Sequence, residues 1–296
     1  TVSWGSEMCI RDSARSIPSI LPELTFEEAL EITKIHSVTG AMKGKNGIVS
    51  ERPFRAPHHT ASSASLIGGG TRAMPGEISL AHYGVLFLDE FPEFRKDTLE
   101  ALRQPIEDGF VTITRASARS TYPAQFMLVA AMNPCPCGNY GSRITPCRCT
   151  AQQIQRYRNR ISGPMLDRID IHIEMGEVGY NDIAGRSCGE PSGAIRARVN
   201  AARAIQTRRY AGTGILFNAQ LTNRMMNQYC VLTSDAEALM KKAFASLKLS
   251  ARAYTRLLKV SRTIADLAGS EQIKAEHIAE AIQYRSLESK YWGEIR

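Results

Sequence analysis

The 296-residue sequence lacks any run of about 18 or more apolar residues, the length that a helix needs to cross a bilayer. Its first residues also lack the apolar stretch of a secretory signal. These absences argue against a membrane or exported protein and favour the cytoplasm. With 43% hydrophobic and 22% charged residues, the composition is ordinary for a globular chain of one large domain or two smaller ones.

Acidic residues are scarce between Arg196 and Arg262. This stretch holds thirteen Lys and Arg but only Asp235 and Glu237, an excess of eleven positive charges that exceeds the net +8 of the whole chain. Such asymmetry suggests a polyanion partner, nucleic acid first. A set of solvated helix faces would give the same count.

Cysteine is too rare for a scaffold built from disulfides, since the chain has seven. Four of them crowd together as Cys135, Cys137, Cys147 and Cys149. Thiolate pairs on Gly/Pro turns suit a tetrahedral Zn²⁺, and without a secretory signal a metal site is favoured over two disulfides. Free or redox-active thiols are the alternative, because Cys-x-Cys is less common than Cys-x-x-Cys in zinc sites.

The order of local patterns predicts an α/β layer followed by a helical bundle. Thr25 and Glu28 form a capping box for a helix that runs to His36. Residues 40–70 are rich in Gly, Ser and Pro and predict a long functional loop with a short helix. The other expected elements are a strand at 85–88, a helix at 95–109, two strands within 110–133, a helix at 150–161, a strand at 168–175, a linker at 176–193 and helices at 194–210, 234–245, 250–269 and 274–288.

The apolar run Val85–Leu88 ends in two adjacent carboxylates, Asp89 and Glu90. A run this short is typical of a strand covered on both faces in a parallel sheet, and such sheets bind ligands beyond the carboxyl ends of their strands. In a nucleotide hydrolase Asp89 can hold Mg²⁺ beside the phosphates, and Glu90 can orient or deprotonate the attacking water. The alternative is a strand end with two solvated acids.

Other polar residues fit the same chemistry. Asn133 ends a second apolar stretch and can approach the same water. Arg168 lies on a short turn, and an arginine supplied to a neighbour's phosphate neutralises charge in the transition state. For His58 and His59 a structural role explains the pair at least as well as contact with phosphate, metal or DNA.

The segments "GVLFLDEFPEF", "AAMNPCPCG", "RISGPMLDRIDIH" and "SARAYTRLLKVSRTIADLAG" resemble the magnesium-chelatase-like ATPases of the AAA+ class, and within them the ComM/YifB group. The resemblance covers residues 14–290. It implies an α/β fold, with an AAA+ parallel-sheet nucleotide-binding core that is truncated at its N-terminus. An all-α helical lid would follow this core.

The resemblance also implies roles for single residues. Asp89 and Glu90 would be the Walker B pair, Asn133 sensor 1, Arg168 the arginine finger and Arg252 sensor 2. The segment "FVTITRASARS" would be a hairpin that points at DNA in related helicases. ATP and Mg²⁺ are the implied ligands, and a cytoplasmic homo-oligomer, a hexameric ring without membrane contact, is the implied assembly.

The implied function is that of the C-terminal portion of an AAA+ ATPase that couples ATP hydrolysis to DNA remodelling. Branch migration or helicase activity in natural transformation or recombination is the implied process. A chelatase-type ATPase that remodels a protein partner without DNA contact is the alternative. The basic stretch 196–262 and the hairpin favour DNA.

One motif of the family is missing. The family carries a P-loop, G-x-x-x-x-G-K-[ST], upstream of a segment like "ARSIPSILP", and "GAMKGKNG" has the wrong spacing to replace it. Residues 1–13 fit nothing that follows and are expected to be a non-native or disordered leader in its place. The expected domains are then 14–178 for the core, 179–193 for a linker and 194–296 for the lid. Without the P-loop, we expect this fragment to be inactive alone.

Overall fold

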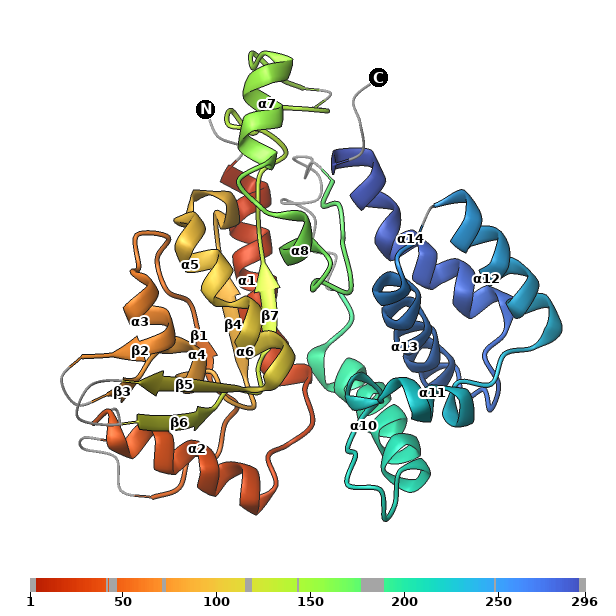
Figure 1. Ribbon diagram of the computed structural model, residues 1–296, viewed down its shortest axis with the longest axis horizontal. Helices are drawn as coiled ribbons and strands as arrows, with labels where there is room; N and C mark the ends of the chain where they lie inside the picture. The colour runs from red at the N-terminus through yellow and green to blue at the C-terminus, as the bar shows by residue number, and fades with distance from the viewer. Residues whose placement is uncertain are drawn as a thin grey trace. The chain divides into compact units, whose positions relative to one another are not determined.

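The computed structural model describes residues 4–40, 42, 47–70, 73–114, 119–142, 144–176, 189–247 and 249–292. The chain divides into two compact units (Figure 1). The first comprises 1–19, 23–168 and 175–187, and the second comprises 20–22, 169–174 and 188–296. A parallel sheet with helices forms the first unit and helices form the second, so the expected α/β core and helical domain are confirmed.

The parallel sheet that the structure describes has three strands in the order β1-β4-β7. β4 (Val85–Leu88) lies at its centre, between β1 (Phe54–Arg55) and β7 (Met127–Ala130). All four side chains of β4 are buried, which explains its uniformly apolar sequence. Phe87 of this strand belongs to a buried cluster with Ala14 and Ala131. The strand predicted at 85–88 is confirmed.

Helices and short strands complete the first unit. Thr25 Oγ1 accepts a hydrogen bond from the Glu28 N–H at 3.2 Å and the Glu28 carboxylate accepts one from the Thr25 N–H at 3.0 Å, so the predicted capping box is confirmed. The elements are α1 (Trp4–Ile20), α2 (Phe26–Val38), α3 (Ser63–Ile67), β2 (Gly68–Gly69), β3 (Met74–Pro75), α4 (Glu77–Leu80), the 3₁₀ turn η1 (Phe91–Glu93), α5 (Lys96–Ala101), α6 (Arg103–Asp108), α7 (Ala151–Arg158) and α8 (Gly163–Leu166).

The segment 110–133 forms three strands instead of the two expected. β5 (Phe110–Thr114) and β6 (Arg119–Pro123) pair as an antiparallel hairpin apart from the parallel sheet (Figure 1). A hydrogen bond from the Ala124 N–H to the Gly109 carbonyl, 2.7 Å long, closes the base of this hairpin. The chain then enters β7, which ends before Asn133.

The strand expected at 168–175 is wrong. Residues 169–176 adopt no regular element, and in the described part of the chain they join no sheet. The alternation of Ile171 and Ile173 with polar neighbours imitates a strand, but the Ile173 side chain is 68% exposed. The His172 N–H donates instead to the Tyr284 carbonyl at 2.8 Å, so a helix takes the hydrogen bond that a neighbouring strand would receive.

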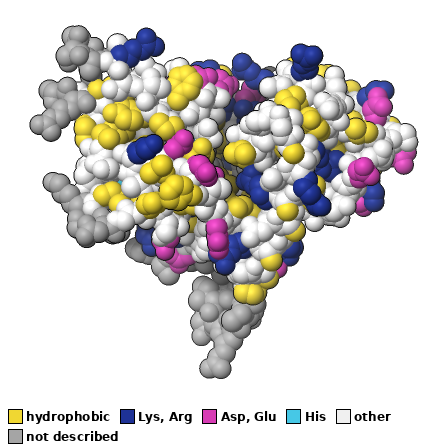
Figure 2. Space-filling view, turned by 90° about the horizontal axis from the view of Figure 1, so that it is seen from below, with side chains coloured by type: hydrophobic (Ala, Val, Ile, Leu, Met, Phe, Trp, Pro, Cys, Tyr) yellow, Lys and Arg dark blue, Asp and Glu magenta, His cyan; other side chains and the backbone are white. Residues whose placement is uncertain are grey.

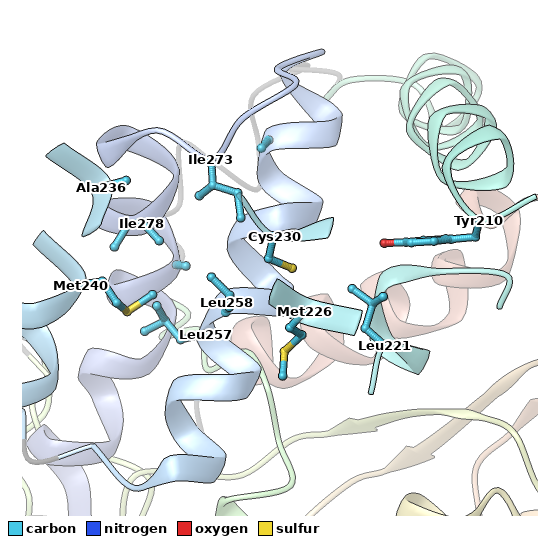
Figure 3. Close-up of a cluster of buried hydrophobic side chains, with 12 residues drawn as sticks. Tyr210, Leu221, Met226, Cys230, Ala236, Met240, Leu257, Leu258, Ile273 and Ile278 are labelled. Carbon is cyan, nitrogen blue, oxygen red and sulfur yellow. The ribbon is translucent and has the colours of Figure 1, made fainter. Parts of the chain in front are cut away.

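The second unit confirms the four helices that the sequence predicted and adds a short one, α11. The helices are α10 (Ser192–Arg209), α11 (Asn223–Tyr229), α12 (Ser234–Ser246), α13 (Ala251–Leu267) and α14 (Ala275–Trp292). In their core, Leu257 of α13, Met240 of α12 and Ile278 of α14 lie together (Figure 3). The predicted linker lies mostly outside the described residues, at 177–188. None of the described helices has the length and apolar character needed to cross a membrane.

A buried carboxylate joins the helices of the second unit. Asp266 of α13 receives hydrogen bonds from Arg209 of α10 at 2.5 and 2.9 Å, from Arg262 at 3.1 Å and from Asn218 at 2.8 Å. A carboxylate with no exposed side-chain surface is tolerated because these donors compensate its lost hydration. Arg209 and Arg262, two of the thirteen basic residues counted above, are therefore occupied inside the fold.

Candidate nucleotide site and metal centre

Asp89 and Glu90 follow β4 directly, at the carboxyl end of the parallel sheet. The Glu90 N–H donates to Asp89 Oδ1 at 3.0 Å, and the next residue, Phe91, donates its N–H to the Ala131 carbonyl at 2.9 Å. Glu90 has a left-handed backbone, with φ of 51°. A non-glycine residue held in this region costs about 1–3 kcal/mol, and such strain concentrates at functional sites.

Both carboxylates have a basic partner and both remain accessible. Arg11 Nη2 lies 2.6 Å from Asp89 Oδ2, and His59 Nδ1 lies 2.6 Å from Glu90 Oε2. The Asp89 side chain is 29% exposed and that of Glu90 is 49% exposed. An accessible carboxylate that already attracts a cationic group fits Mg²⁺, which takes one or two protein carboxylates and completes its shell with water and phosphate. Arg11 belongs to segment 1–13, for which a non-native or disordered leader was expected, but from Trp4 onward this segment is helical as part of α1. A magnesium ion at Asp89 would displace the Arg11 guanidinium.

The position of His59 follows from the pairing of β1 with β4. β1 pairs with β4 so that Phe54 is opposite Val85 and Arg55 opposite Leu86. His59 follows β1 by four residues and Glu90 follows β4 by two, so the two parallel strands lead both residues to the same edge of the sheet. The ring of His58 lies 4.1 Å from that of His59, and its Nδ1 lies 2.9 Å from Thr60 Oγ1. The sequence left the role of this histidine pair open, and the structure shows Glu90 as the partner of His59.

Asn133 lies three residues beyond β7, at the same end of the sheet as Asp89. Its backbone forms a hydrogen bond with Tyr157 of α7. Burial is the main cause that raises the pKa of Tyr157 above its ordinary value. The sheet therefore brings the strand ends that bear Asp89, Glu90 and Asn133 to one edge, as the sequence predicted.

Of the two predicted arginines, Arg168 has other partners within the first unit and Arg252 belongs to the second unit. The Arg168 side chain is only 6% exposed, and its Nη2 lies 2.7 Å from Glu107 Oε1. Its Nη1 donates to the Pro164 carbonyl at 2.5 Å. Arg252 is exposed in the first turn of α13, in the second unit. The nucleotide-binding roles of these two residues stay predictions.

The four clustered cysteines lie close enough to share a metal ion. The Sγ atoms of Cys135, Cys137 and Cys147 are 3.4, 3.7 and 3.6 Å apart, and all four cysteine Sγ atoms lie within 4.8 Å of one another. A tetrahedral Zn²⁺ with Zn–S bonds of about 2.3 Å would separate its sulfur atoms by about 3.8 Å. Disulfide sulfur atoms would be about 2.05 Å apart, so these thiols are not paired by disulfides.

Two of the four thiols, those of Cys135 and Cys137, have pKa values shifted in opposite directions. Backbone N–H groups of Asn139 and Arg148 are the main causes that lower the pKa of Cys137 to about 6. Burial is the main cause that raises the pKa of Cys135 to about 12. A metal ion placed among them would be the missing positive charge that lets the buried thiol become a thiolate.

The loop that carries the four clustered cysteines contacts α7 close to Asn133. Arg158 donates from its Nε to the Pro134 carbonyl at 3.2 Å, and its guanidinium lies 4.8 Å from the ring centre of Tyr140. The loop therefore shares its anchor with the end of the strand segment that bears Asn133.

Comparison with known families and proteins gives a consistent result. The family model described as "Magnesium chelatase, subunit ChlI" matches residues 10–183, and the one described as "Magnesium chelatase, subunit ChlI C-terminal" matches residues 189–285. The competence protein ComM of Haemophilus influenzae is 47% identical over 276 residues, covering 93% of this chain and 53% of that protein. The protein YifB of Escherichia coli is 45% identical over 277 residues, with the same coverage.

A more distant similarity reaches the zygotic DNA replication licensing factor mcm6-A of Xenopus laevis. It is 23% identical over 217 residues, covering 70% of this chain and 25% of that protein. The chain spans about half the length of the ComM and YifB proteins that it matches.

Proposed function

The chain belongs to the magnesium-chelatase family, and to its ComM/YifB group, and on this premise we propose that it carries the hydrolytic residues of an AAA+ ATPase. The observation that supports this proposal is the pair Asp89 and Glu90 on a strained turn at the carboxyl end of a buried central strand. Family membership implies ATP and Mg²⁺ as ligands, and the accessible carboxylate of Asp89 fits the ion.

In the proposed reaction Asp89 would hold Mg²⁺, which would supply neutralising charge beside the phosphates. Glu90 orients a water molecule and accepts one of its protons. The water oxygen then forms a bond to the γ-phosphorus while the bond from that phosphorus to the bridging oxygen of ADP breaks. Asn133 positions the same water. Arg168 and Arg252 contribute positive charge to the phosphates, with Arg168 acting on the site of a neighbouring subunit in a hexameric ring.

We expect the 296-residue chain to bind ATP weakly or not at all. Holding the phosphates requires the Lys and backbone N–H groups of a P-loop, and this sequence contains no such motif. Isothermal titration calorimetry with Mg-ATP tests the expectation. The matched control is a chimera in which a segment with the P-loop pattern G-x-x-x-x-G-K-[ST] is joined upstream of Ala14. Micromolar binding by the chain alone would show that its phosphate site has been misassigned.

We propose DNA as the substrate on which the ATPase acts, with branch migration or strand separation as the outcome. The support is the relatives' names, a competence protein and a DNA replication factor, together with the hairpin and its exposed Arg119. The count of basic residues supports it less than the sequence suggested, since Arg209 and Arg262 bind Asp266. On the face shown in Figure 2, Lys and Arg side chains are interspersed with acidic and hydrophobic ones.

DNA binding by the chain is expected to weaken about tenfold or more between roughly 50 and 200 mM salt, because phosphate contacts release counterions. Fluorescence anisotropy with a labelled oligonucleotide measures this. Arg119→Ala should weaken binding and reduce the salt slope by about one. Arg95→Ala is the matched control, since Arg95 is exposed but pairs with Asp97. Absent or salt-independent binding would favour the alternative substrate, a protein partner.

We also propose that the cysteine cluster binds one structural Zn²⁺. The four Sγ atoms lie within 4.8 Å of one another, close enough to converge on one ion, and thiolates are preferred zinc ligands. A metal ion would order a loop whose Pro and Gly residues leave little apolar surface for packing.

A further inference from the structure

The Arg168 side chain is held inside its own chain by only two of its three nitrogen atoms, and we call this the docked state. Its two terminal nitrogens bind Glu107 at 2.7 Å and the Pro164 carbonyl at 2.5 Å. Its Nε is buried and, within the described residues, has no hydrogen-bond partner. A buried N–H without a partner weakens the docked state, because it loses its hydration and gains nothing in return. The docked guanidinium can therefore be released at modest cost.

Glu107 lies at the base of the β5–β6 hairpin. It occupies the last turn of α6, and Gly109 ends that helix in a left-handed conformation with φ of 72°. β5 begins at the next residue, Phe110, and the hairpin closes onto the Gly109 carbonyl. Only two residues separate Glu107 from β5. A displacement of the hairpin therefore moves the carboxylate that holds Arg168.

A second carboxylate holds the other end of α8 more firmly. Glu100 accepts a hydrogen bond from the Ser162 hydroxyl at 2.6 Å and one from Arg103 at 2.6 Å. Glu107, in contrast, has Arg168 as its one ion-pair partner among the described residues. α8 is thus fixed at its N-terminal end, while the contact beyond its C-terminal end depends on one ion pair.

We propose that Glu107 is a positioning residue that keeps Arg168 docked in its own subunit and releases it when nucleic acid displaces the β5–β6 hairpin. The proposal rests on the proposed function, in which Arg168 serves a neighbour's nucleotide. Glu107 and a nucleotide phosphate compete for the same guanidinium, since both offer oxygen acceptors that arginine binds in pairs. The hairpin then couples DNA binding to the availability of Arg168.

Chemical modification of arginine tests the docking of Arg168 in the 296-residue chain, and this test does not require ATPase activity. Phenylglyoxal is added, and the modification rate of Arg168 is read by peptide mass spectrometry. Glu107→Gln should raise this rate about fivefold, which corresponds to losing about 1 kcal/mol, the upper end of the free energy that a partly exposed ion pair contributes. Asp108→Asn is the matched control, because it makes the same charge change at the next, exposed position. Arg158, which is 3% exposed in the same unit, reports on folding and should react at an unchanged rate.

A saturating concentration of a single-stranded oligonucleotide tests whether DNA binding releases Arg168 from Glu107. It should raise the modification rate of Arg168 in the parent chain and add little in Glu107→Gln. Equal Arg168 rates in Glu107→Gln and Asp108→Asn would overturn the docking role of Glu107. An oligonucleotide that binds without changing the Arg168 rate would overturn the coupling. An oligonucleotide that does not bind would overturn the coupling and the DNA proposal together, while the Glu107→Gln result still decides the docking role.

Discussion

Glu90→Gln is expected to lower ATP turnover about 10²–10⁴-fold while leaving ATP binding unchanged, because a carboxamide cannot accept the proton of the attacking water. The measurement uses the chimera described above, which carries a phosphate-binding loop. Its ATP affinity comes from calorimetry and its turnover from phosphate release. Gln keeps the size of the side chain and leaves an oxygen or nitrogen beside His59, so the turn after β4 should be preserved.

Glu93→Gln provides the matched control for this prediction. Glu93 lies three residues further on, is comparably exposed, and pairs with Arg160 at 2.5 Å instead of with His59. The same loss of charge there should leave turnover within a small factor of the parent. Parent-like turnover in Glu90→Gln would refute the assignment of Glu90. An equal loss in both variants would show that η1, and not one carboxylate, matters.

The second large effect is expected at the metal centre. Protein purified without chelator should contain close to one zinc per chain by elemental analysis. The double variant Cys147→Ser, Cys149→Ser should lose the metal, because hydroxyl groups do not replace thiolates as zinc ligands. Since metal-binding free energy becomes folding free energy, the first unit should also unfold at a lower temperature, and turnover of the chimera should fall.

Cys230→Ser is the control for this experiment. Cys230 is a buried free thiol of the second unit, where burial raises its pKa to about 11, and it has no place in the cluster. Its replacement should destabilise the second unit while the zinc content stays at one. A metal-free parent chain whose stability and activity match those of the double variant would leave the four cysteines without a ligand role.

Local signals in the sequence predicted the parts of the fold that depend on local chemistry. The capping box at Thr25 and Glu28 and the buried strand before Asp89 are of this kind, since each pattern carries its own physical cause. The alternation at Ile171 and Ile173 failed, because a strand also requires a neighbour and the described chain supplies none there.

Within the candidate site, the sequence could predict only the residues whose positions depend on where the strands end. Parallel strands end at one edge, so Asp89 and Asn133 were expected together. The contact between His59 and Glu90 depends on the pairing of strands about thirty residues apart in sequence, and no local pattern encodes that. The contact of Arg168 with Glu107 likewise joins residues 61 positions apart, which no local pattern encodes. The charge count failed for Arg209 and Arg262 because composition does not show which cations are already paired.

The network around Asp266 has a mechanical consequence. Arg209 reaches it from α10 and Arg262 from within α13, so these two helices are locked at one point of their length. Sliding α10 by a single turn would leave a buried carboxylate without one of its cations, a cost of about 3–5 kcal/mol. The second unit is therefore stiff along this pair of helices. A displacement imposed on α10 would then be passed to α13 with little internal strain.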